Sequence, residues 1–405
     1  MIARNPRIAH LEAGYLFPEI ARRRRAFEAA HPAAGPEDRV LSLGIGNTTE
    51  PILPLTGAGL TEGARCLATP EGYTGYGDEQ GLPVLREKIA EVWYHGAVQA
   101  DEVFVSDGAK CDIGRLQLLF GQEVPVTVQD PSYPVYVDGS VLAGAAGAWA
   151  GAGYQGITYL PCTAENGFFP DLTPLPQGAV LYFCSPNNPT GAACTRPQLQ
   201  RLVDTALRRQ ALIVFDAAYA AFIRDPQLPR SIYEITDAAS CAIEVNSFSK
   251  PAGFTGVRLG WTVVPRALKY RDGKSIHTDW LRIVTTIFNG ASNIAQAGGL
   301  AALSEGGLGE IRALTDYYLR NASLILQTLK GLGIPCVGGD NSPYVWARFA
   351  GRDSWEVFGE ILEKCRVVTT PGAGFGPAGQ GFIRFSAFGH QKDIEEACRR
   401  LGERL

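Results

Sequence analysis

A lysine and an arginine eight residues apart, Lys250 and Arg258, are the first candidates for chemistry in this sequence. A lysine amine can attack a carbonyl group, and the planar guanidinium of an arginine can bind a phosphate through two hydrogen bonds. Two serines, Ser247 and Ser249, precede the lysine, and Gly253 and Gly256 would let the backbone approach a bulky group. The stretch therefore predicts a reactive lysine beside a phosphate site.

The short apolar run 241–245 precedes this stretch and predicts a buried strand that ends just before Lys250. In open α/β sheets, ligands bind in the crevice beyond the carboxyl ends of the strands. A phosphate-bearing aldehyde that reacts with a lysine is pyridoxal phosphate, and Lys250 would form a Schiff base with it and later carry a proton. A single lysine is more often a solvated surface residue, so the prediction depends on the residues around it.

Asp216 follows the apolar run 211–215 and is the candidate partner of the pyridine nitrogen of the cofactor. An ionised carboxylate there keeps the nitrogen protonated, and the ring then acts as an electron sink. Tyr219 would donate a hydrogen bond to the phenolic oxygen of the ring. Asp216 comes 34 residues before Lys250, which leaves room for one helical connection and one strand of the same sheet.

Two glycine-containing turns also follow predicted strands. The run 103–105 leads into an Asp-Gly turn and then a helix that begins at Ala109 and Lys110. The free N–H groups of that helix end would bind the cofactor phosphate, and Lys110 would also contact the substrate. The run 40–43 leads into a glycine turn that ends at Gly46, where the backbone would lie against the substrate.

Two more strand ends supply polar side chains. The run 124–128 leads to Tyr133, whose aromatic face would stack on the pyridine ring and assist catalysis. The run 180–184 leads into a proline-fixed turn that carries Asn187. The amide of Asn187 would donate to the ring oxygen and contact the substrate carboxylate.

The repeated order of strand, loop and helix from residue 102 onward predicts an α/β fold with a mostly parallel central sheet covered by helices. A long helix at 310–329 would then lead into a smaller α+β domain with strands at 344–348 and 382–386. With 405 residues, the chain is long enough for two domains that share a large core.

Several longer motifs accompany these residues and are specific when taken together. They are 15–20 (YLFPEI), 43–51 (LGIGNTTEP), 105–112 (VSDGAKCD), 129–134 (QDPSYP), 185–191 (SPNNPTG), 247–261 and 288–293 (FNGASN). On these motifs the chain resembles the class I/II aminotransferases, which are fold-type I pyridoxal-phosphate transferases. Over nearly its whole length it resembles their LL-diaminopimelate aminotransferase branch.

This resemblance implies three parts: an N-terminal arm with part of the small domain at 1–48, a large cofactor-binding domain at 49–294, and a small C-terminal domain at 295–405. It also implies an aminotransferase that depends on pyridoxal 5′-phosphate. LL-2,6-diaminopimelate and 2-oxoglutarate would be converted reversibly to tetrahydrodipicolinate and glutamate, in the synthesis of lysine and peptidoglycan precursors. Lys250 would be the Schiff-base lysine of this reaction.

The same resemblance assigns roles to residues that pattern alone would leave open. Tyr15, Asn293 and Arg384 would contact the substrate, Arg384 through two charge-assisted hydrogen bonds to its carboxylate. Tyr76 would cross the interface of a homodimer and reach the cofactor phosphate of the neighbouring site. Glu79 is the candidate for the distal ammonium of the substrate, although a loop carboxylate is usually solvated.

Together these inferences define two sets of contacts. The predicted cofactor contacts are Tyr76, Ala109, Lys110, Tyr133, Asn187, Asp216, Tyr219, Ser247, Phe248, Ser249, Lys250, Arg258 and Asn293. The predicted substrate contacts are Tyr15, Gly46, Glu79, Lys110, Tyr133, Asn187, Asn293 and Arg384. Two positions, Asn47 and Pro251, depart from the family pattern without removing a group that the chemistry needs.

Three alternatives share part of this pattern. An aminotransferase for aspartate, glutamate or an aromatic amino acid would keep the cofactor residues and differ around Tyr15 and Glu79. A carbon–sulfur lyase could use the same fold and cofactor. An aminotransferase-like effector-binding module of a transcription regulator would normally follow a basic helix-turn-helix domain, and none is visible ahead of the first motif.

Composition excludes other classes of function. The formal net charge of −4 gives no electrostatic reason to expect nucleic acid or an anionic membrane, and the basic run 22–25 has the pattern of a solvated helix face. We find no apolar run of membrane-spanning length and no signal peptide, and the nine cysteines include no CxxC pair. These features predict a cytoplasmic protein with reduced thiols and no metal site.

Overall fold

The computed structural model describes residues 2–11, 16–33, 35, 38–151 and 153–405. Its helices are α1 (Pro6–His10), α2 (Leu16–Ala30), α3 (Pro54–Leu67), α4 (Pro83–Tyr94), α5 (Ala109–Leu116), α6 (Val135–Ala143), α7 (Arg196–Arg209), α8 (Ile276–Ile287), α9 (Asn293–Ala302), α10 (Glu305–Gly331), α11 (Ser354–Cys365) and α12 (Gln391–Arg404). Its strands are β1 (Leu41–Ser42), β2 (Val103–Ser106), β3 (Val126–Asp130), β4 (Ile157–Pro161), β5 (Val180–Cys184), β6 (Leu212–Asp216), β7 (Ala242–Ser247), β8 (Gly260–Val263), β9 (Cys336–Gly338), β10 (Tyr344–Arg348), β11 (Val367–Val368), β12 (Thr370–Pro371) and β13 (Phe382–Ser386).

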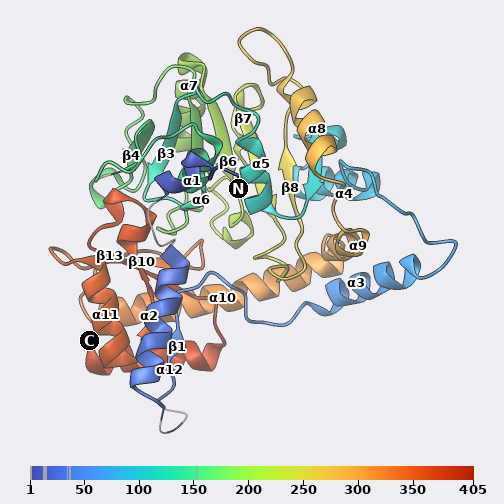
Figure 1. The fold of residues 1–405 in the computed structure, drawn as a ribbon. Helices are drawn as coiled ribbons and strands as arrows, with labels where there is room; N and C mark the ends of the chain where they lie inside the picture. Colours follow the sequence, from blue (N-terminus) through green and yellow to red (C-terminus); the bar gives the residue numbers. More distant parts are fainter. Residues whose placement is uncertain (1, 12–15, 34, 36–37, 152) are drawn as a thin grey trace.

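Seven strands form the main sheet in the order β2-β8-β7-β6-β5-β3-β4 (Figure 1). Strands β3 to β7 pair in parallel, whereas β8 runs antiparallel to both of its neighbours. The prediction of a mostly parallel central sheet is therefore confirmed. Because β2 is reversed twice relative to β7, its carboxyl end lies at the same edge as those of β3, β5, β6 and β7.

Helices cover both faces of this sheet, and the strand sequences show why. Leu181 and Phe183 of β5 pack in one apolar cluster with residues of α7, including Leu202. Val180 and Tyr182, which alternate with them, pack in the cluster on the other face. A strand with two buried faces must be apolar throughout, and the continuous apolar runs in the sequence satisfy this condition.

Two smaller sheets contain the C-terminal strands, and one of them also includes the N-terminal strand β1. The order β12-β13-β10-β9 forms an antiparallel sheet, and β1 pairs in parallel with β11. Leu16 and Ile20 of α2 and Leu41 of β1 are buried in one cluster with Phe358 and Ile383. The blue N-terminal segment accordingly lies beside the red C-terminal helices (Figure 1).

Most predicted elements are found with small shifts at their ends. Helix α10 contains the predicted segment 310–329. One expectation was wrong: the connection from Asp216 to β7 contains three short 3₁₀ turns, Ala220–Phe222, Ile232–Glu234 and Ala238–Ser240, where we expected a helical connection. Prolines within this connection prevent a longer helix, because proline lacks the N–H that a helix interior needs.

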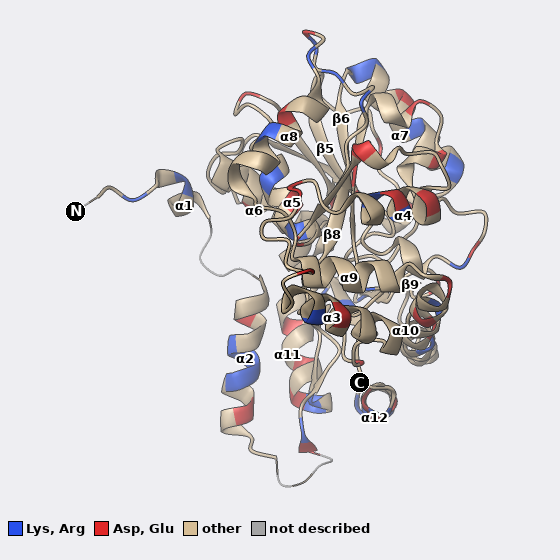
Figure 2. Ribbon diagram, turned by 90° about the vertical axis from the view of Figure 1, so that its right-hand side faces the viewer, with Lys and Arg blue, Asp and Glu red and all other residues tan. Residues whose placement is uncertain are grey.

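The basic run of α2 is a solvated helix face, as predicted. Arg22 and Arg23 pair with Glu19 at 2.7 and 2.8 Å, and Arg24 pairs with Glu28 at 2.9 Å. In Figure 2 the blue stretch of α2 accordingly lies between red residues. Within the described residues, no helix combines the length and apolar character that crossing a membrane requires.

Candidate active site

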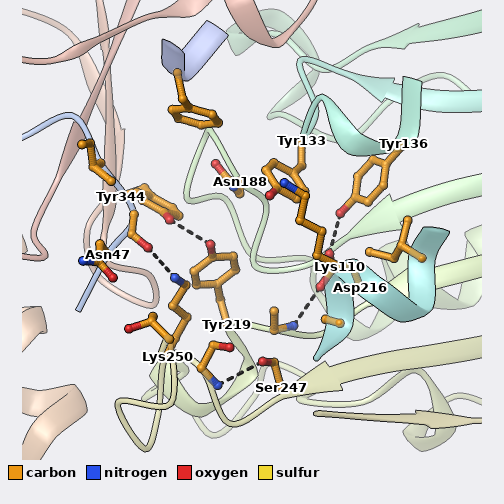
Figure 3. A pocket seen from close by; sticks show the side chains of 18 of the residues that line it. Asn47, Lys110, Tyr133, Tyr136, Asn188, Asp216, Tyr219, Ser247, Lys250 and Tyr344 are labelled. Atoms are coloured by element: carbon orange, nitrogen blue, oxygen red, sulfur yellow. Dashed lines mark hydrogen bonds between the residues drawn. The ribbon is translucent and has the colours of Figure 1, made fainter. Parts of the chain in front are cut away.

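A cavity of about 310 Å³ opens at the edge of the main sheet where the parallel strands end. Residues from the small sheet and from the turn after β1 close its other side, including Arg384, Tyr344 and Gly46. The predicted site residues that line it are Gly46, Ala109, Lys110, Tyr133, Asp216, Tyr219, Ser247, Ser249, Lys250, Arg258 and Arg384. Figure 3 shows Lys250, Tyr219 and Asp216 directed into the same space from different segments.

Lys250 follows the end of β7 by three residues, and its amine is directed across the cavity. Nζ donates a hydrogen bond to the carbonyl oxygen of Gly46. Burial, together with the positive charges of Arg384 and Arg258, lowers the pKa of Lys250 to about 8. A larger fraction of this amine is therefore neutral near pH 7 than for a solvated lysine, and the neutral amine is the nucleophile.

Asp216 ends β6 and is held by two hydrogen bonds. Tyr136 Oη donates to Oδ2 at 2.6 Å, and the backbone N–H of Ala218 donates to Oδ1 at 3.0 Å. Asp216 forms no ion pair with any described residue, and burial raises its pKa. A buried carboxylate without a cation suits a ligand that brings a positive charge, such as a protonated pyridine nitrogen.

The opposite end of the cavity has the features of a phosphate site. Helix α5 begins after Gly108, which has φ 123° and provides no side-chain cap for the helix N-terminus. A Cβ at Gly108 would lie 2.5 Å from Nη2 of Arg258, so the close approach of the arginine requires glycine. Arg258 donates to Ser249 Oγ at 3.3 Å. A helix N-terminus beside a guanidinium is well suited to a phosphate.

The buried carboxyl group of Asp112 helps to fix the turn at the start of α5. Asp112 Oδ2 accepts hydrogen bonds from Ser106 Oγ at 2.6 Å and from Thr262 Oγ1 at 2.7 Å. Ser106 Oγ in turn accepts from the N–H of Gly108 at 3.2 Å. The turn that presents the helix end is thus tied to both β2 and β8.

Arg384 of β13 is buried, and the protein does not use all of its N–H donors. Nη1 donates to Asn188 Oδ1 and Nη2 to the carbonyl oxygen of Gly44, both at 2.6 Å. The ring of Tyr344 lies 4.4 Å from the guanidinium carbon. The buried Nε has no hydrogen-bond partner among the described residues. A buried guanidinium with a spare donor is suited to a carboxylate.

Two tyrosine hydroxyls meet beside the turn after β1. Tyr219 Oη and Tyr344 Oη lie 2.8 Å apart, and burial raises the pKa of both groups. A Cβ at position 46 would collide with the hydroxyl of Tyr344, so the turn needs glycine there. Gly46 thereby brings its backbone next to Lys250 and Tyr344.

The structure corrects the choice between two neighbouring asparagines. Asn187 does not line the cavity: its amide donates to the carbonyl of Pro131 at 3.2 Å and to Thr190 Oγ1 at 3.1 Å. Asn188 lines the cavity and accepts from Arg384. The hydrogen bonds that close the turn fix this direction, which the residue types alone did not indicate. Phe248 also lies outside the cavity, in an apolar cluster.

Three other predicted residues lie together outside the cavity. Tyr76 is 85% exposed, and Asn293 donates to Thr74 Oγ1 of the same loop at 2.8 Å. Glu79 belongs to this loop as well and does not line the cavity. Tyr15, the remaining predicted contact, lies outside the described residues.

Sequence reasoning missed Tyr136 and Tyr344 as well as Asn188. Tyr136 stands one helical turn after Tyr133, and this spacing was a usable signal for a second cavity residue. Tyr344 gave no comparable signal, because it occupies a buried strand of a different sheet. Only the packing of the small sheet against the main one brings it next to Lys250 (Figure 3).

The charged side chains that line the cavity indicate what kind of ligand it binds. Its described lining contains four cationic side chains, Lys110, Lys250, Arg258 and Arg384, and one carboxylate, Asp216. This balance suits a phosphate and a carboxylate bound together, with a protonated ring between them. The residues present therefore fit pyridoxal 5′-phosphate with an amino-acid substrate.

Comparison with known proteins leads to the same family. The model of "Aminotransferase class I and II" matches residues 38–401. An LL-diaminopimelate aminotransferase of Protochlamydia amoebophila is 52% identical over 407 residues, covering 100% of this chain and 98% of the relative. A chloroplastic enzyme of the same name from Arabidopsis thaliana is 53% identical over 403 residues, covering 99% of this chain and 86% of the relative.

The solved structures include a similar protein. L,L-diaminopimelate aminotransferase from Chlamydomonas reinhardtii superposes with a TM-score of 0.95 at 54% identity, covering 99% of this chain and 98% of that one. An aspartate aminotransferase variant from Thermus thermophilus has a TM-score of 0.84 at 20% identity, a likeness of fold alone. The chain belongs to the class I and II aminotransferases, and it is an enzyme that depends on pyridoxal 5′-phosphate.

Proposed function

We propose that the enzyme transfers an amino group reversibly between LL-2,6-diaminopimelate and 2-oxoglutarate. The products of the forward reaction are tetrahydrodipicolinate and glutamate, in the synthesis of lysine and peptidoglycan precursors. The observation that carries this proposal is the full-length identity of 52–53% to relatives named for that substrate. The cavity supports the reaction class, since it combines a reactive lysine with sites for a phosphate and a carboxylate.

Pyridoxal 5′-phosphate, when bound, supplies an aldehyde that captures the substrate amine and a ring that withdraws electrons from the α carbon. Lys250 Nζ would first hold the cofactor and would then move a proton from the α carbon of the substrate to the carbon that was the cofactor's aldehyde carbon. Its pKa, lowered to about 8, increases the fraction of the neutral amine, which is the form that accepts this proton. The carbonyl of Gly46 orients the free Nζ before the cofactor binds.

Asp216 would hold the ring nitrogen in its protonated form. Its hydrogen bonds to Tyr136 and to the N–H of Ala218 stabilise the ionised carboxylate, which burial alone would disfavour. Tyr133, which lines the cavity on the side of α6, would stack on the ring. Tyr219 would donate to the phenolic oxygen, and its hydrogen bond with Tyr344 orients the hydroxyl.

Arg384 would bind the α-carboxylate of the substrate. Asn188 and the carbonyl of Gly44 fix the guanidinium plane, so little side-chain freedom is lost on binding. A fixed carboxylate places the α hydrogen within reach of Lys250. At the other end, Ala109, Lys110 and Arg258 would hold the phosphate.

We also propose a homodimer in which each subunit completes the other's site. Tyr76 is an 85% exposed aromatic residue on the loop 71–81, and a large exposed side chain of this kind is common at interfaces. A Cβ at Gly77 would lie 2.8 Å from Asn293 Oδ1, so this loop and Asn293 form one unit. The unit would enter the partner's cavity, with Glu79 near the distal ammonium of the substrate.

The division of the chain at 1–48, 49–294 and 295–405 remains our proposal for its domains. The burial of Leu16 and Leu41 among residues of the small sheet supports an N-terminal arm that belongs with the C-terminal part. We propose a cytoplasmic location, consistent with nine cysteines that form no disulfide in the structure.

The test is a half-reaction followed by the visible spectrum of the bound cofactor, without any keto acid. LL-diaminopimelate and glutamate should convert the spectrum, whereas meso-diaminopimelate, aspartate and phenylalanine should not. Conversion by aspartate or phenylalanine but not by LL-diaminopimelate would leave the aminotransferase class intact and reject the substrate. Lys250→Ala serves as the control that lacks the reactive amine.

A further inference from the structure

A second cavity of about 480 Å³ lies between the end of α4, the segment 221–234 and the first turns of α10. It is larger than the cavity at Lys250, and the two share no described lining residue. None of the roles assigned above uses its side chains. Its size falls in the range of cavities that bind small organic molecules.

Aromatic side chains form one wall of this cavity and are held in place by buried hydrogen bonds. Tyr94 Oη donates to Glu244 Oε1 at 2.8 Å and accepts from Trp261 Nε1 at 2.8 Å. Tyr233 Oη lies 3.1 Å from two strand carbonyl oxygens, to which it can donate. Trp93 lines the same wall. The wall is therefore formed before any ligand binds.

The lining also contains three arginines, one histidine and one carboxylate, Glu234. The charge of Glu234 is already compensated by an arginine outside the cavity lining, because Glu234 pairs with Arg196 at 2.8 Å. Glu234 also accepts a hydrogen bond from the backbone N–H of Arg230 at 2.7 Å. The charge of Arg224 is compensated as well, since Arg224 pairs with Asp316 at 2.6 Å. Positive charge is therefore in excess.

Arg230 and Arg312 carry this excess. Arg230 donates to a backbone carbonyl at 3.3 Å and forms no ion pair with any described residue. Arg312 has one distant partner, Asp316 at 4.0 Å. Partial burial and the charges of Arg224 and Arg312 lower the pKa of Arg230, which shows that its charge is poorly compensated.

We propose that this cavity binds a small organic anion with a flat apolar body, of the class of the aromatic carboxylates. Arg230 and Arg312 would bind the carboxylate, and Trp93 and Tyr233 would contact the ring. A neutral ligand of the same shape would leave the guanidinium charges uncompensated. This site is independent of the reaction at Lys250.

Crystals of the holoenzyme soaked with 4-bromobenzoate test the location. We expect an anomalous bromine peak within this cavity, at the end away from Arg230 and Arg312, because the bromine is para to the carboxylate. A peak found only in the cavity at Lys250, or no peak at all, would overturn the proposal.

Calorimetric titration of the holoenzyme tests the chemistry with benzoate and its neutral analogue benzamide. Arg230→Gln and Arg312→Gln should each weaken benzoate binding about tenfold. Arg312 is an exposed helix residue, so its substitution leaves the fold intact even if Arg230→Gln perturbs the neighbouring loop. Arg271→Gln, a surface arginine hydrogen-bonded to Gln210, should change nothing. Equal benzoate affinity in all variants, or benzamide binding as tight as benzoate, would contradict the site.

Discussion

The hydroxyl of Tyr136 donates a hydrogen bond of 2.6 Å to Oδ2 of Asp216, from the first turn of α6 to the last residue of β6. The ring of Tyr136 is itself stacked on Tyr182, with centroids 5.3 Å apart and planes at 8°. The carboxylate is therefore held by a side chain that cannot turn away. The hydrogen bond favours the ionised form of Asp216, which burial disfavours.

Tyr136→Phe should weaken the binding of pyridoxal phosphate and slow the reaction. The variant removes one of two hydrogen bonds to a buried carboxylate, which costs about 1–3 kcal/mol. We expect the dissociation constant of pyridoxal phosphate to rise about tenfold and the acid limb of the kcat profile to move to higher pH. Absorbance titration and pH–rate profiles measure both. Tyr159→Phe, whose hydroxyl accepts from Tyr154 N, is the control, and identical profiles for both variants would contradict the role.

The lowered pKa of Lys250 predicts how the apoenzyme takes up its cofactor. Only the neutral amine attacks an aldehyde, and burial lowers the pKa of this amine to about 8. The rate of covalent uptake should rise about tenfold per pH unit below that value and level off above it. Stopped-flow absorbance measures this rate. A rate that still rises between pH 9 and 10 would indicate a solvated lysine.

Arg384→Lys should impair substrate binding far more than cofactor binding. A lysine has no planar fork, and it cannot keep the bonds to Asn188 and Gly44 while also binding a carboxylate. We expect KM for the amino-acid substrate to rise about a hundredfold, with the cofactor affinity nearly unchanged. Arg348→Lys on the neighbouring strand β10 is the matched control, because that side chain is exposed. Equal effects of the two substitutions would exclude the assignment.

Glu244 makes the stability of the protein depend on pH. Burial raises its pKa from 4.5 to about 7, so the folded state binds a proton that the unfolded state releases. This contribution to stability is complete below pH 4.5 and is lost as the pH rises through about 7. Its full size is about 3 kcal/mol.

Glu244→Gln cannot ionise and should remove this dependence. Relative to the parent enzyme, the variant should become more stable as the pH rises from 5 to 8. Thermal unfolding of both proteins across this range measures the difference. Parallel Tm curves for the two proteins would show that Glu244 does not titrate in this range.

The proposed homodimer predicts complementation between two impaired variants. Lys250→Ala lacks the reactive amine, and Tyr76→Ala lacks the side chain offered to the partner. Subunits mixed in equal amounts and allowed to exchange should recover about a quarter of the parent activity, since half of the dimers are hybrids with one complete site. Activity before and after exchange measures this. No recovery, despite hybrid dimers seen by mass spectrometry, would place Tyr76 in its own subunit's site.

Residues that follow strands of the main sheet were predictable from the sequence. Lys250, Asp216 and Tyr133 follow apolar runs, and the carboxyl ends of parallel strands share one edge of the sheet. Asn188 was missed for a local reason. The hydrogen bonds of the turn, including those of Asn187 with Thr190, decide which of two adjacent amides faces the cavity.

Site residues that come from the small sheet were harder to predict from the sequence. Arg384 was assigned through the family resemblance, and Tyr344, on the adjacent strand, was missed. Their positions depend on how two sheets pack, which no local pattern encodes. The second cavity has the same origin, because α4 and α10 are more than two hundred residues apart.

The pairing of β1 with β11 has a consequence for how the enzyme matures. Leu41 is paired with Val367, and the carbonyl of Gly44 accepts from both Thr370 and Arg384. The turn that carries Gly46 is thus held by residues made more than three hundred positions later. During synthesis, the main sheet and Lys250 are complete while this wall is still missing. Binding of the vitamin-derived cofactor should therefore be a late event. A nascent chain stalled on the ribosome before residue 367 should show no absorbance from bound cofactor.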